Sequence, residues 1–247
     1  MSEEIVGESL ALNQLLVSAK RLALSDSPIL IAGERGSGKE LLARVIHRAS
    51  PRRNRHFVKV DCGTTARALL DRELFGFEKG AFDGAISAKT SPLELADKGT
   101  LFVDEIARIP LDLQFKLVQV LVQGEFERLG DTRLIRVHVR LIAATRHDPE
   151  KIAGDRLHQT LYDQFNRASI RIPPLRERRE DISLLAHHFL RKFARRMNKD
   201  IETIEPETMD ALLNYDWPGN VKQLESFIER SIILTGGSRL QAPLDEL

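Results

Sequence analysis

The stretch Pro28-Ile29-Leu30-Ile31-Ala32-Gly33-Glu34-Arg35-Gly36-Ser37-Gly38-Lys39-Glu40 decides the fold, because an apolar run leads directly into a glycine-rich turn. A helical pattern over residues 39–49 follows. Three glycines let backbone N–H groups close around phosphate oxygens, and Lys39 and the positive end of the helix add charge. The stretch therefore predicts a strand, a phosphate-binding loop formed by Gly33 to Glu40, and a helix that together hold a nucleoside triphosphate.

The same alternation of apolar runs and helical patterns continues through the first two thirds of the chain. It predicts a mostly parallel sheet covered on both faces, which is an α/β fold. Predicted strands cover 28–32, 56–61, 100–104, 137–145 and 169–172, and predicted helices cover 39–49, 69–75 and 111–122.

A boundary is predicted at Pro173-Pro174, since two prolines continue neither a helix nor a central strand. Helical patterns follow over 180–197, 206–214 and 220–234, with Gly236-Gly237 expected to end the last one. We predict a nucleotide-binding domain over residues 1–173 and a small helical lid domain over 174–247.

Composition excludes several classes of protein. The 247 residues are 42% hydrophobic and 30% charged, and a net charge of +1 gives no electrostatic basis for strong nucleic-acid or membrane binding. The basic cluster Arg52-Arg53-Asn54-Arg55 is expected to be a solvated surface loop. Cys62, the single cysteine, is expected in the core and forms no internal disulfide, and no apolar run approaches the ~18 residues of a membrane span. These features predict a cytoplasmic protein.

Two carboxylates end a second apolar run, Thr100-Leu101-Phe102-Val103-Asp104-Glu105. In phosphate-loop enzymes the first carboxylate organises Mg²⁺ and the second polarises the attacking water. Glu40 replaces the Ser or Thr whose hydroxyl usually touches Mg²⁺. Asp104 is therefore the predicted Mg²⁺ ligand, and Asp104 and Glu105 are the predicted catalytic pair.

More specific motifs give a family resemblance over about residues 5 to 236. They are Glu73-Leu74-Phe75-Gly76, Gly80-Ala81-Phe82-Asp83-Gly84-Ala85, Pro173-Pro174-Leu175-Arg176-Glu177-Arg178 and Trp217-Pro218-Gly219-Asn220. With the phosphate-binding loop, in which Glu40 is itself typical, the chain resembles the central AAA+ domain of bacterial enhancer-binding proteins, the activators of sigma-54 RNA polymerase. The resemblance implies ATP as the nucleotide, a ring in which ATP is hydrolysed between subunits, and contact with sigma-54 through the loop Gly80 to Ala85.

The resemblance also marks residues that depart from the family. Asp83 replaces a Thr at the loop tip, which puts the sigma-54 contact in question. Phe82 has two interpretations, an aromatic that packs on its own subunit or one that contacts the partner.

The largest departure is at two positions where the family carries arginines that reach a neighbour's ATP. They are His158 and Gln164 here. Because such an arginine contributes about 10³ to 10⁵ in rate in other NTPases, their loss predicts weak hydrolysis. Arg156 and Arg167 are alternative sources of the missing charge.

Three further departures from the family also indicate weaker hydrolysis. Lys222 replaces the family's lid arginine and keeps the charge without the bidentate fork. Arg146 replaces an Asn after the sensor strand, at a position that varies. Asp61 replaces the Asn that pairs with the catalytic glutamate, and two carboxylates share a hydrogen bond only when one is protonated.

Three further sites have alternative interpretations. Arg44 is either a contact for cyclic di-GMP, as the resemblance allows, or an ion-paired surface residue. His187-His188 point in different directions on a helix, which argues against a metal pair. Trp217 is expected to pack the lid, with Asn220 as the N-cap of the last helix.

Two mechanisms are consistent with this reading. The favoured one is an ATP-binding module with impaired hydrolysis, in which nucleotide controls oligomeric state and the full protein acts on RNA polymerase with its sigma factor. The alternative is an active ring ATPase that remodels sigma-54 polymerase through Gly80 to Ala85. Family members read DNA with a helix-turn-helix domain, which is expected to lie outside this chain; the expected partners are other copies of the chain and the polymerase, with no membrane.

Overall fold

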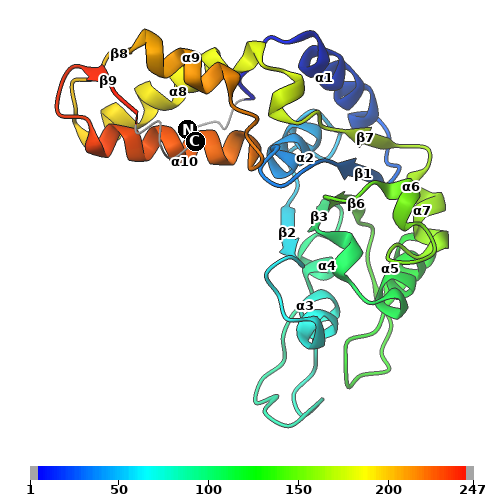
Figure 1. Ribbon diagram of the computed structural model, residues 1–247. Helices are drawn as coiled ribbons and strands as arrows, with labels where there is room; N and C mark the ends of the chain where they lie inside the picture. The colour runs from blue at the N-terminus through cyan, green and yellow to red at the C-terminus, as the bar shows by residue number, and fades with distance from the viewer. Residues whose placement is uncertain (1–4, 243–247) are drawn as a thin grey trace. The chain divides into compact units, whose positions relative to one another are not determined.

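Residues 5–242 are described in a computed structural model, and they divide into two compact units (Figure 1). The sheet unit contains residues 17–33 and 39–171. The helical unit contains, of the described residues, 5–16, 34–38 and 172–242. Helix α1 (Leu10–Ala23) begins in the helical unit and ends in the sheet unit.

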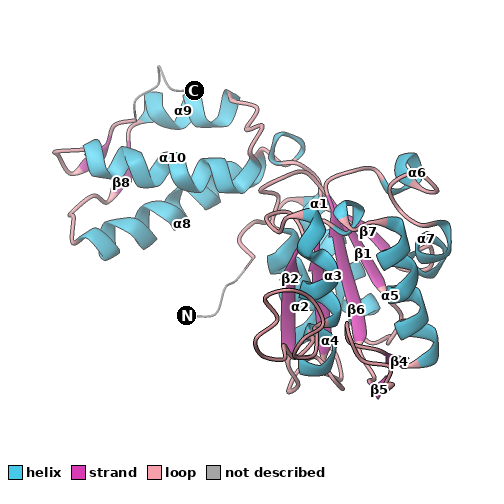
Figure 2. Ribbon diagram, turned by 90° about the horizontal axis from the view of Figure 1, so that it is seen from below, coloured by secondary structure: helices cyan, strands magenta, loops and turns pink. Residues whose placement is uncertain are grey.

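Within the described residues of the sheet unit, five parallel strands form one sheet in the order β2-β3-β6-β1-β7 (Figure 2). This confirms the predicted α/β class and each of the predicted strands to within a few residues. The strands are β1 (Ile29–Ala32), β2 (Phe57–Asp61), β3 (Thr100–Asp104), β6 (Arg140–Thr145) and β7 (Ser169–Arg171).

The apolar runs fold as central strands because both faces of the sheet are covered. Every residue of β1 and of β6 is buried, as are the first four residues of β3. Continuous burial of this kind is typical of parallel strands, whose side chains have no solvated face. Cys62 also lies in this core, as predicted, and burial raises the pKa of its thiol to about 12.

Helices of the sheet unit follow the strands. Helix α2 packs on β1, β3 and β6. The predicted helices at 39–49, 69–75 and 111–122 are confirmed as α2 (Lys39–Arg48), α3 (Leu70–Phe75) and α5 (Leu111–Gln123). Elements that the sequence analysis missed are α1, α4 (Pro92–Leu95), α6 (Pro149–Ile152), α7 (Gln159–Phe165) and the antiparallel pair β4 (Glu125–Phe126) and β5 (Ile135–Arg136).

Arg52 corrects the prediction of a fully solvated basic loop. Its side chain is buried, pairs with Asp26 at 2.9 Å and donates to the carbonyls of Gly99 and His138 at 2.9 and 2.8 Å. Arg52 therefore joins separate loops of the sheet unit, while residues 53–55 of the cluster stay exposed.

Arg140, the first residue of β6, is 1% exposed. Its guanidinium donates to the carbonyls of Ala23 at 3.0 Å and Leu22 at 2.7 Å, at the C-terminal end of α1. Carbonyls at a helix end lack partners inside the helix and carry partial negative charge, so a buried cation satisfies both needs.

The helical unit is built from α8 (Glu180–Met197), α9 (Pro206–Asn214) and α10 (Asn220–Leu234), which confirms the three predicted helices. Short strands β8 (Thr203–Ile204) and β9 (Arg239–Leu240) pair in parallel. Trp217 is fully buried, donates to the Leu212 carbonyl at 2.8 Å and packs on Phe227, which confirms its predicted packing role.

The predicted glycine ending of α10 is wrong. The helix ends at Leu234, and the N–H of Thr235 bonds to the Ser231 carbonyl while Thr235 keeps φ at −70°. A left-handed glycine cap is therefore not used.

The N-terminal segment of the helical unit is tied to α8 through a buried carboxylate. Asp181 accepts from the N–H groups of Glu8 and Ser9 at 2.7 and 2.8 Å and from the Ser9 hydroxyl at 2.8 Å. Arg178 lies 3.8 Å away and supplies the opposite charge. None of the helices described within residues 5–242 is both long and apolar enough to cross a bilayer.

Candidate functional site

The candidate site begins at the carboxyl ends of the parallel strands. Asp61 of β2 is in register with Asp104 of β3, and Ala32 of β1 is in register with Thr145 of β6. Since parallel strands end at the same edge of a sheet, the loops after these residues meet there, and ligands of open α/β sheets bind at this edge.

Three residues of the phosphate-binding loop belong to the sheet unit: Gly33, Lys39 and Glu40. The buried ammonium of Lys39 donates to the Gly33 carbonyl at 2.7 Å and lies 3.8 Å from Glu105 Oε1. Burial lowers the pKa of Lys39, while the carboxylates of Glu105 and Asp104 oppose that shift. The structure thus brings together the predicted phosphate ligand and the predicted catalytic pair.

The middle of the loop, Glu34–Gly38, belongs to the helical unit, where side chains of that unit hold it. Arg176 makes two hydrogen bonds to the Glu34 carboxylate at 2.6 and 2.8 Å. Asn220 Nδ2 donates to Glu34 at 3.0 Å and to the Arg35 carbonyl at 3.1 Å. These contacts fix the loop backbone in a defined path.

Asn220 corrects the predicted N-cap. It is the first residue of α10 with φ at +54°, and its buried side chain accepts from the Leu175 N–H at 2.8 Å. Gly219 occupies the N-cap position. A polar residue before an apolar helix gives the same signal for a cap and for a long-range bridge, so the sequence does not separate the two.

Gly36 and Ser37 show how closely the loop is packed. Gly36 has φ at +75°, and a Cβ there would lie 2.2 Å from the Gly219 carbonyl oxygen, so only glycine fits. The Gly36 carbonyl accepts from the Lys222 N–H at 3.2 Å. The buried hydroxyl of Ser37 has no hydrogen-bond partner among the described residues, which suits a loop that meets a ligand oxygen.

Asp104 and Glu105 form the acidic side of the site. Burial raises the pKa of Asp104 despite the nearby charges of Lys39 and Lys59. Asp104 Oδ1 and Glu105 Oε2 are buried without a hydrogen-bond partner among the described residues. Glu105 also has left-handed backbone angles, φ 58° and ψ 54°, a strained conformation that is frequent at functional sites.

Asp61, at the position where the family carries Asn, makes no hydrogen bond with Glu105 within the described residues. Asp61 Oδ1 instead accepts from the N–H of Gly63 at 2.8 Å and of Thr64 at 3.3 Å, in a turn closed by its own side chain. Arg146 forms an ion pair with the Glu105 oxygen that Lys39 does not contact, with Nε 4.0 Å from Oε2. Arg146 was missed as a site residue, although its position after a sensor strand was a usable signal.

Glu40 is part of a network of charged side chains, and it does not take the place of the hydroxyl that usually contacts the metal. It accepts from Lys59 and from Arg44, each at 2.7 Å. Burial opposes its ionisation, but these two hydrogen bonds outweigh burial and hold the pKa of Glu40 below its usual range. The guanidinium of Arg44 also lies 4.8 Å from the ring centre of Phe57. These contacts favour the ion-paired interpretation of Arg44 over a cyclic di-GMP contact.

The loop Gly80 to Ala85 is closed by its own backbone, with the Gly80 N–H bonded to the Ala85 carbonyl at 2.9 Å. Phe82 packs on Phe77, and the guanidinium of Arg72 lies 3.4 Å from its ring centre. Asp83 is exposed at the tip. Phe82 is thus held by its own chain, while Asp83 presents its carboxylate to solvent.

His158 and Gln164 both lie on or next to α7. His158 is the N-cap of α7, with Nδ1 accepting from the Thr160 N–H at 3.3 Å, and its ring packs on Phe115. Gln164 carries no charge, and it is partly buried.

Lys222 is placed differently from a lid cation that faces the nucleotide. Its ammonium donates to Glu225 at 2.9 Å, and its side chain is exposed. Its backbone N–H donates to the Gly36 carbonyl of the phosphate-binding loop. Among the described residues, no group of three or more His, Cys, Asp or Glu side chains is arranged to hold a metal ion.

Two protein-family models match the chain. The model described as "Sigma-54 interaction domain" matches residues 5–171, and the model described as "AAA+ ATPase lid domain" matches residues 176–244.

Two curated relatives illustrate the similarity. The formate hydrogenlyase transcriptional activator FhlA of Escherichia coli K12 is 49% identical over 245 residues, which are 99% of this chain and 35% of FhlA. The transcriptional regulatory protein ZraR of Salmonella typhimurium is 45% identical over 234 residues, which are 94% of this chain and 53% of ZraR. The chain thus spans about a third to a half of these relatives.

Solved structures of similar proteins also match this chain. The crystal structure of NtrX from Brucella abortus in complex with ATP superposes with a TM-score of 0.89 at 37% identity, covering 98% of this chain and 54% of that chain. The complex of the same protein with ADP gives equal values.

Proposed function

This chain belongs to the family of Sigma-54 interaction domains, and from that premise we propose that it binds Mg²⁺-ATP, hydrolyses it slowly and uses the nucleotide as a switch of oligomeric state. The observation that carries the proposal is the meeting of the buried Lys39 ammonium with Glu105 at 3.8 Å, at the carboxyl edge of the sheet. A similar protein, NtrX, has been crystallised with ATP.

Binding is assigned to the phosphate-binding loop and to Lys39. The loop backbone is preorganised by Arg176 and Asn220, so little conformational entropy is lost when phosphates bind. The ammonium of Lys39 exchanges the Gly33 carbonyl for phosphate oxygens, whose negative charge opposes the effect of burial on its pKa.

The residues present fit a magnesium ion. Asp104 Oδ1 is a buried oxygen without a partner among the described residues, and a hard cation takes such oxygens as ligands. When bound, Mg²⁺ neutralises charge that develops on the phosphoryl oxygens. Asp104 would hold it, and a nearby cation would remove the energetic reason for the raised pKa of Asp104.

Slow turnover is assigned to charges that the chain lacks. Glu105 orients and polarises the attacking water, and this role needs no other subunit. The positive charge that a neighbouring subunit would supply is missing, because His158 is engaged as a helix cap and Gln164 is neutral. Neither replaces a guanidinium in a site that stabilises transferring phosphoryl groups.

The proposed partners are further copies of the chain and RNA polymerase with its sigma factor. We place Asp83 at the surface that would meet sigma-54, where a carboxylate replaces a small hydroxyl and weakens contact. DNA contact is proposed only through a helix-turn-helix domain outside this chain.

The test is a side-by-side measurement of ATP affinity and steady-state turnover. We expect wild-type protein to bind ATP in the presence of Mg²⁺ and to turn it over slowly. A His158→Arg, Gln164→Arg double variant should keep the affinity and raise turnover by about 10³-fold or more if both guanidiniums reach the neighbouring site.

Two variants serve as controls for this measurement. Lys39→Ala should abolish binding, and Glu105→Gln should remove the residual turnover while keeping binding. High turnover of the wild-type protein that Glu105→Gln abolishes would contradict the proposal of impaired hydrolysis.

An active ring ATPase that remodels sigma-54 polymerase is the second candidate. The family match over residues 5–171 includes the loop Gly80 to Ala85, which favours it. Capture of purified sigma-54 in the presence of an ATP transition-state mimic separates the candidates: strong capture that a Phe82→Ala variant loses supports the motor, and no capture supports the switch.

A further inference from the structure

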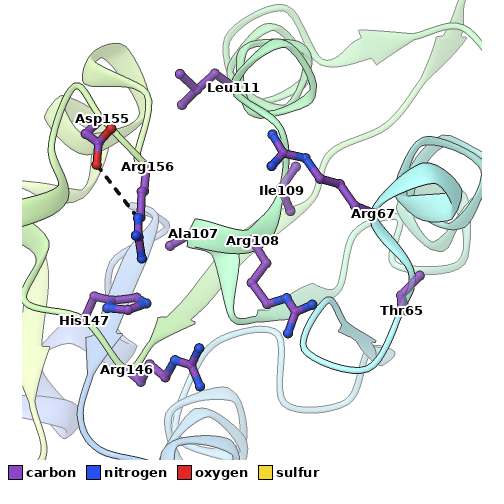
Figure 3. Close-up of a pocket in the computed structure, with 10 residues that line it drawn as sticks. All are labelled: Thr65, Arg67, Ala107, Arg108, Ile109, Leu111, Arg146, His147, Asp155 and Arg156. Atoms are coloured by element: carbon purple, nitrogen blue, oxygen red, sulfur yellow. Dashed lines mark ion pairs between the residues drawn. The ribbon is translucent and has the colours of Figure 1, made fainter.

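A pocket of the sheet unit lies beside the site and is lined mostly by cations. Its volume is about 490 Å³, which is within the range of small-molecule pockets. Figure 3 shows its side chains rising from separate segments around one hollow. The lining residues are Thr65, Arg67, Ala107, Arg108, Ile109, Leu111, Arg146, His147, Asp155 and Arg156.

Four arginines face this pocket against a single carboxylate. Asp155 pairs with Arg156 at 3.8 Å, and Arg146 makes only a long contact of 4.0 Å with Glu105. Arg67 and Arg108 have no ion pair with any described residue. The lining therefore keeps a clear excess of positive charge, in a chain whose overall net charge is only +1.

The chemistry of the walls selects the type of anion. Guanidinium groups bind phosphate oxygens through paired, parallel N–H bonds, and a concave surface with low-dielectric walls concentrates their field. Several guanidiniums from separate segments suit an anion with several phosphate groups rather than one. Ala107, Ile109 and Leu111 add an apolar strip along one side.

We infer that this pocket, defined here as the arginine pocket, binds a small anion that carries at least two phosphate groups. It shares no residue with the loop Gly33 to Glu40, so it is a second anion site. Arg146 links the two sites, because it lines the pocket and lies 4.0 Å from Glu105 Oε2, while Lys39 lies beside the other carboxylate oxygen. An anion in the pocket competes with Glu105 for Arg146 and so changes the surroundings of the catalytic carboxylate.

The test uses inorganic tripolyphosphate as the probe, measured by titration calorimetry without magnesium and with EDTA. The loop that binds ATP is disabled with Lys39→Ala, so that remaining binding reports on the pocket. We expect Lys39→Ala protein to bind tripolyphosphate, and an added Arg67→Gln, Arg108→Gln pair to weaken that binding about tenfold or more.

Matched controls distinguish the pocket from general surface charge. Arg136→Gln removes a cation that is 90% exposed and outside the pocket, and it should leave binding unchanged. Arg67 and Arg108 are themselves exposed, so the pair of substitutions should leave the Tm within about 1 °C of its starting value. Citrate, a tricarboxylate, should bind at least tenfold more weakly than tripolyphosphate.

The outcomes are decisive for the pocket and independent of the ATP proposal. Binding that disappears with Lys39→Ala alone, that survives Arg67→Gln, Arg108→Gln, or that falls equally with Arg136→Gln overturns the inference. Equal binding of citrate overturns the assignment to phosphate. ATP binding by the otherwise wild-type Arg67→Gln, Arg108→Gln protein should be retained, which shows that the phosphate-binding loop is a separate site.

Discussion

At the scale of one residue, Asp104 holds a carboxylate oxygen without a described partner in the proposed site, and this lowers the stability of the folded protein at neutral pH. Its Oδ1 atom is buried and has no hydrogen-bond partner among the described residues, and partial burial of the carboxylate raises its pKa. A raised carboxyl pKa means that the folded protein holds the proton more tightly than the unfolded chain. Asp104 therefore favours folding at low pH, and this contribution is lost as the pH rises from its ordinary value near 3.8 through the raised pKa.

Asp104→Asn should therefore stabilise the protein without nucleotide at pH 7. A gain of about 1 kcal/mol corresponds to a Tm increase of about 2 to 4 °C for a chain of this size. Differential scanning fluorimetry measures it, and the extra stabilisation by Mg²⁺-ATP should become smaller in the variant. Asp83→Asn, on an exposed loop tip, is the matched control and should change neither value. A lower Tm for Asp104→Asn would show that the carboxylate is stabilising instead.

Single residues differ in how well the sequence predicts them. Lys39 and Cys62 follow from local pattern alone, one by its place after a glycine-rich turn and the other by its place after an apolar strand. Arg52, Asp61 and Asn220 do not, because their roles depend on carbonyls and N–H groups that are brought near by the fold or by a local turn. Polar side chains satisfy whichever backbone group lies closest, and sequence does not say which group that is.

At the scale of elements, α1 is held at its C-terminal end by a buried side chain from β6. Arg140→Met keeps most of the apolar stem but leaves the carbonyls of Leu22 and Ala23 without their donors. Unpaired buried carbonyls cost about 1 to 3 kcal/mol, so the free energy of unfolding should fall by that amount. Chemical denaturation followed by circular dichroism measures the change.

Arg136→Met supplies the comparison, since Arg136 is a nearby arginine whose side chain is 90% exposed. It should change the free energy of unfolding by less than about 0.5 kcal/mol. Equal effects of the two substitutions would mean that the contacts of Arg140 with α1 contribute nothing to stability.

The predictability of elements follows from burial and length. Strands β1, β3 and β6 are buried along all or nearly all of their length, and continuous apolar runs in the sequence predict them. The long helices α8 and α10 carry an apolar stripe of several turns. Helices of four residues and strands of two, such as α4 and β4, contain too few residues for a period to be visible, and tertiary contacts decide them.

At the scale of the whole molecule, the phosphate-binding loop is divided between the two units. Gly33 and Lys39 belong to the sheet unit, and Glu34–Gly38 belongs to the helical unit, where Arg176 and Asn220 hold it. Binding energy released at this loop is available to shift the protein between states of different nucleotide affinity.

We expect Mg²⁺-ATP to shift the protein toward larger assemblies. A contact in which one face of a subunit meets a different face of the next one builds rings or filaments, and a ligand that favours the assembled form shifts the equilibrium by mass action. Because hydrolysis is proposed to be slow, ATP itself should sustain the shift during sedimentation velocity runs. Lys39→Ala should sediment alike with and without ATP, while Asp83→Asn should respond as wild type does. A wild-type sedimentation coefficient that ATP leaves unchanged over a hundredfold range of protein concentration would contradict the proposed switch and leave nucleotide binding as a separate property.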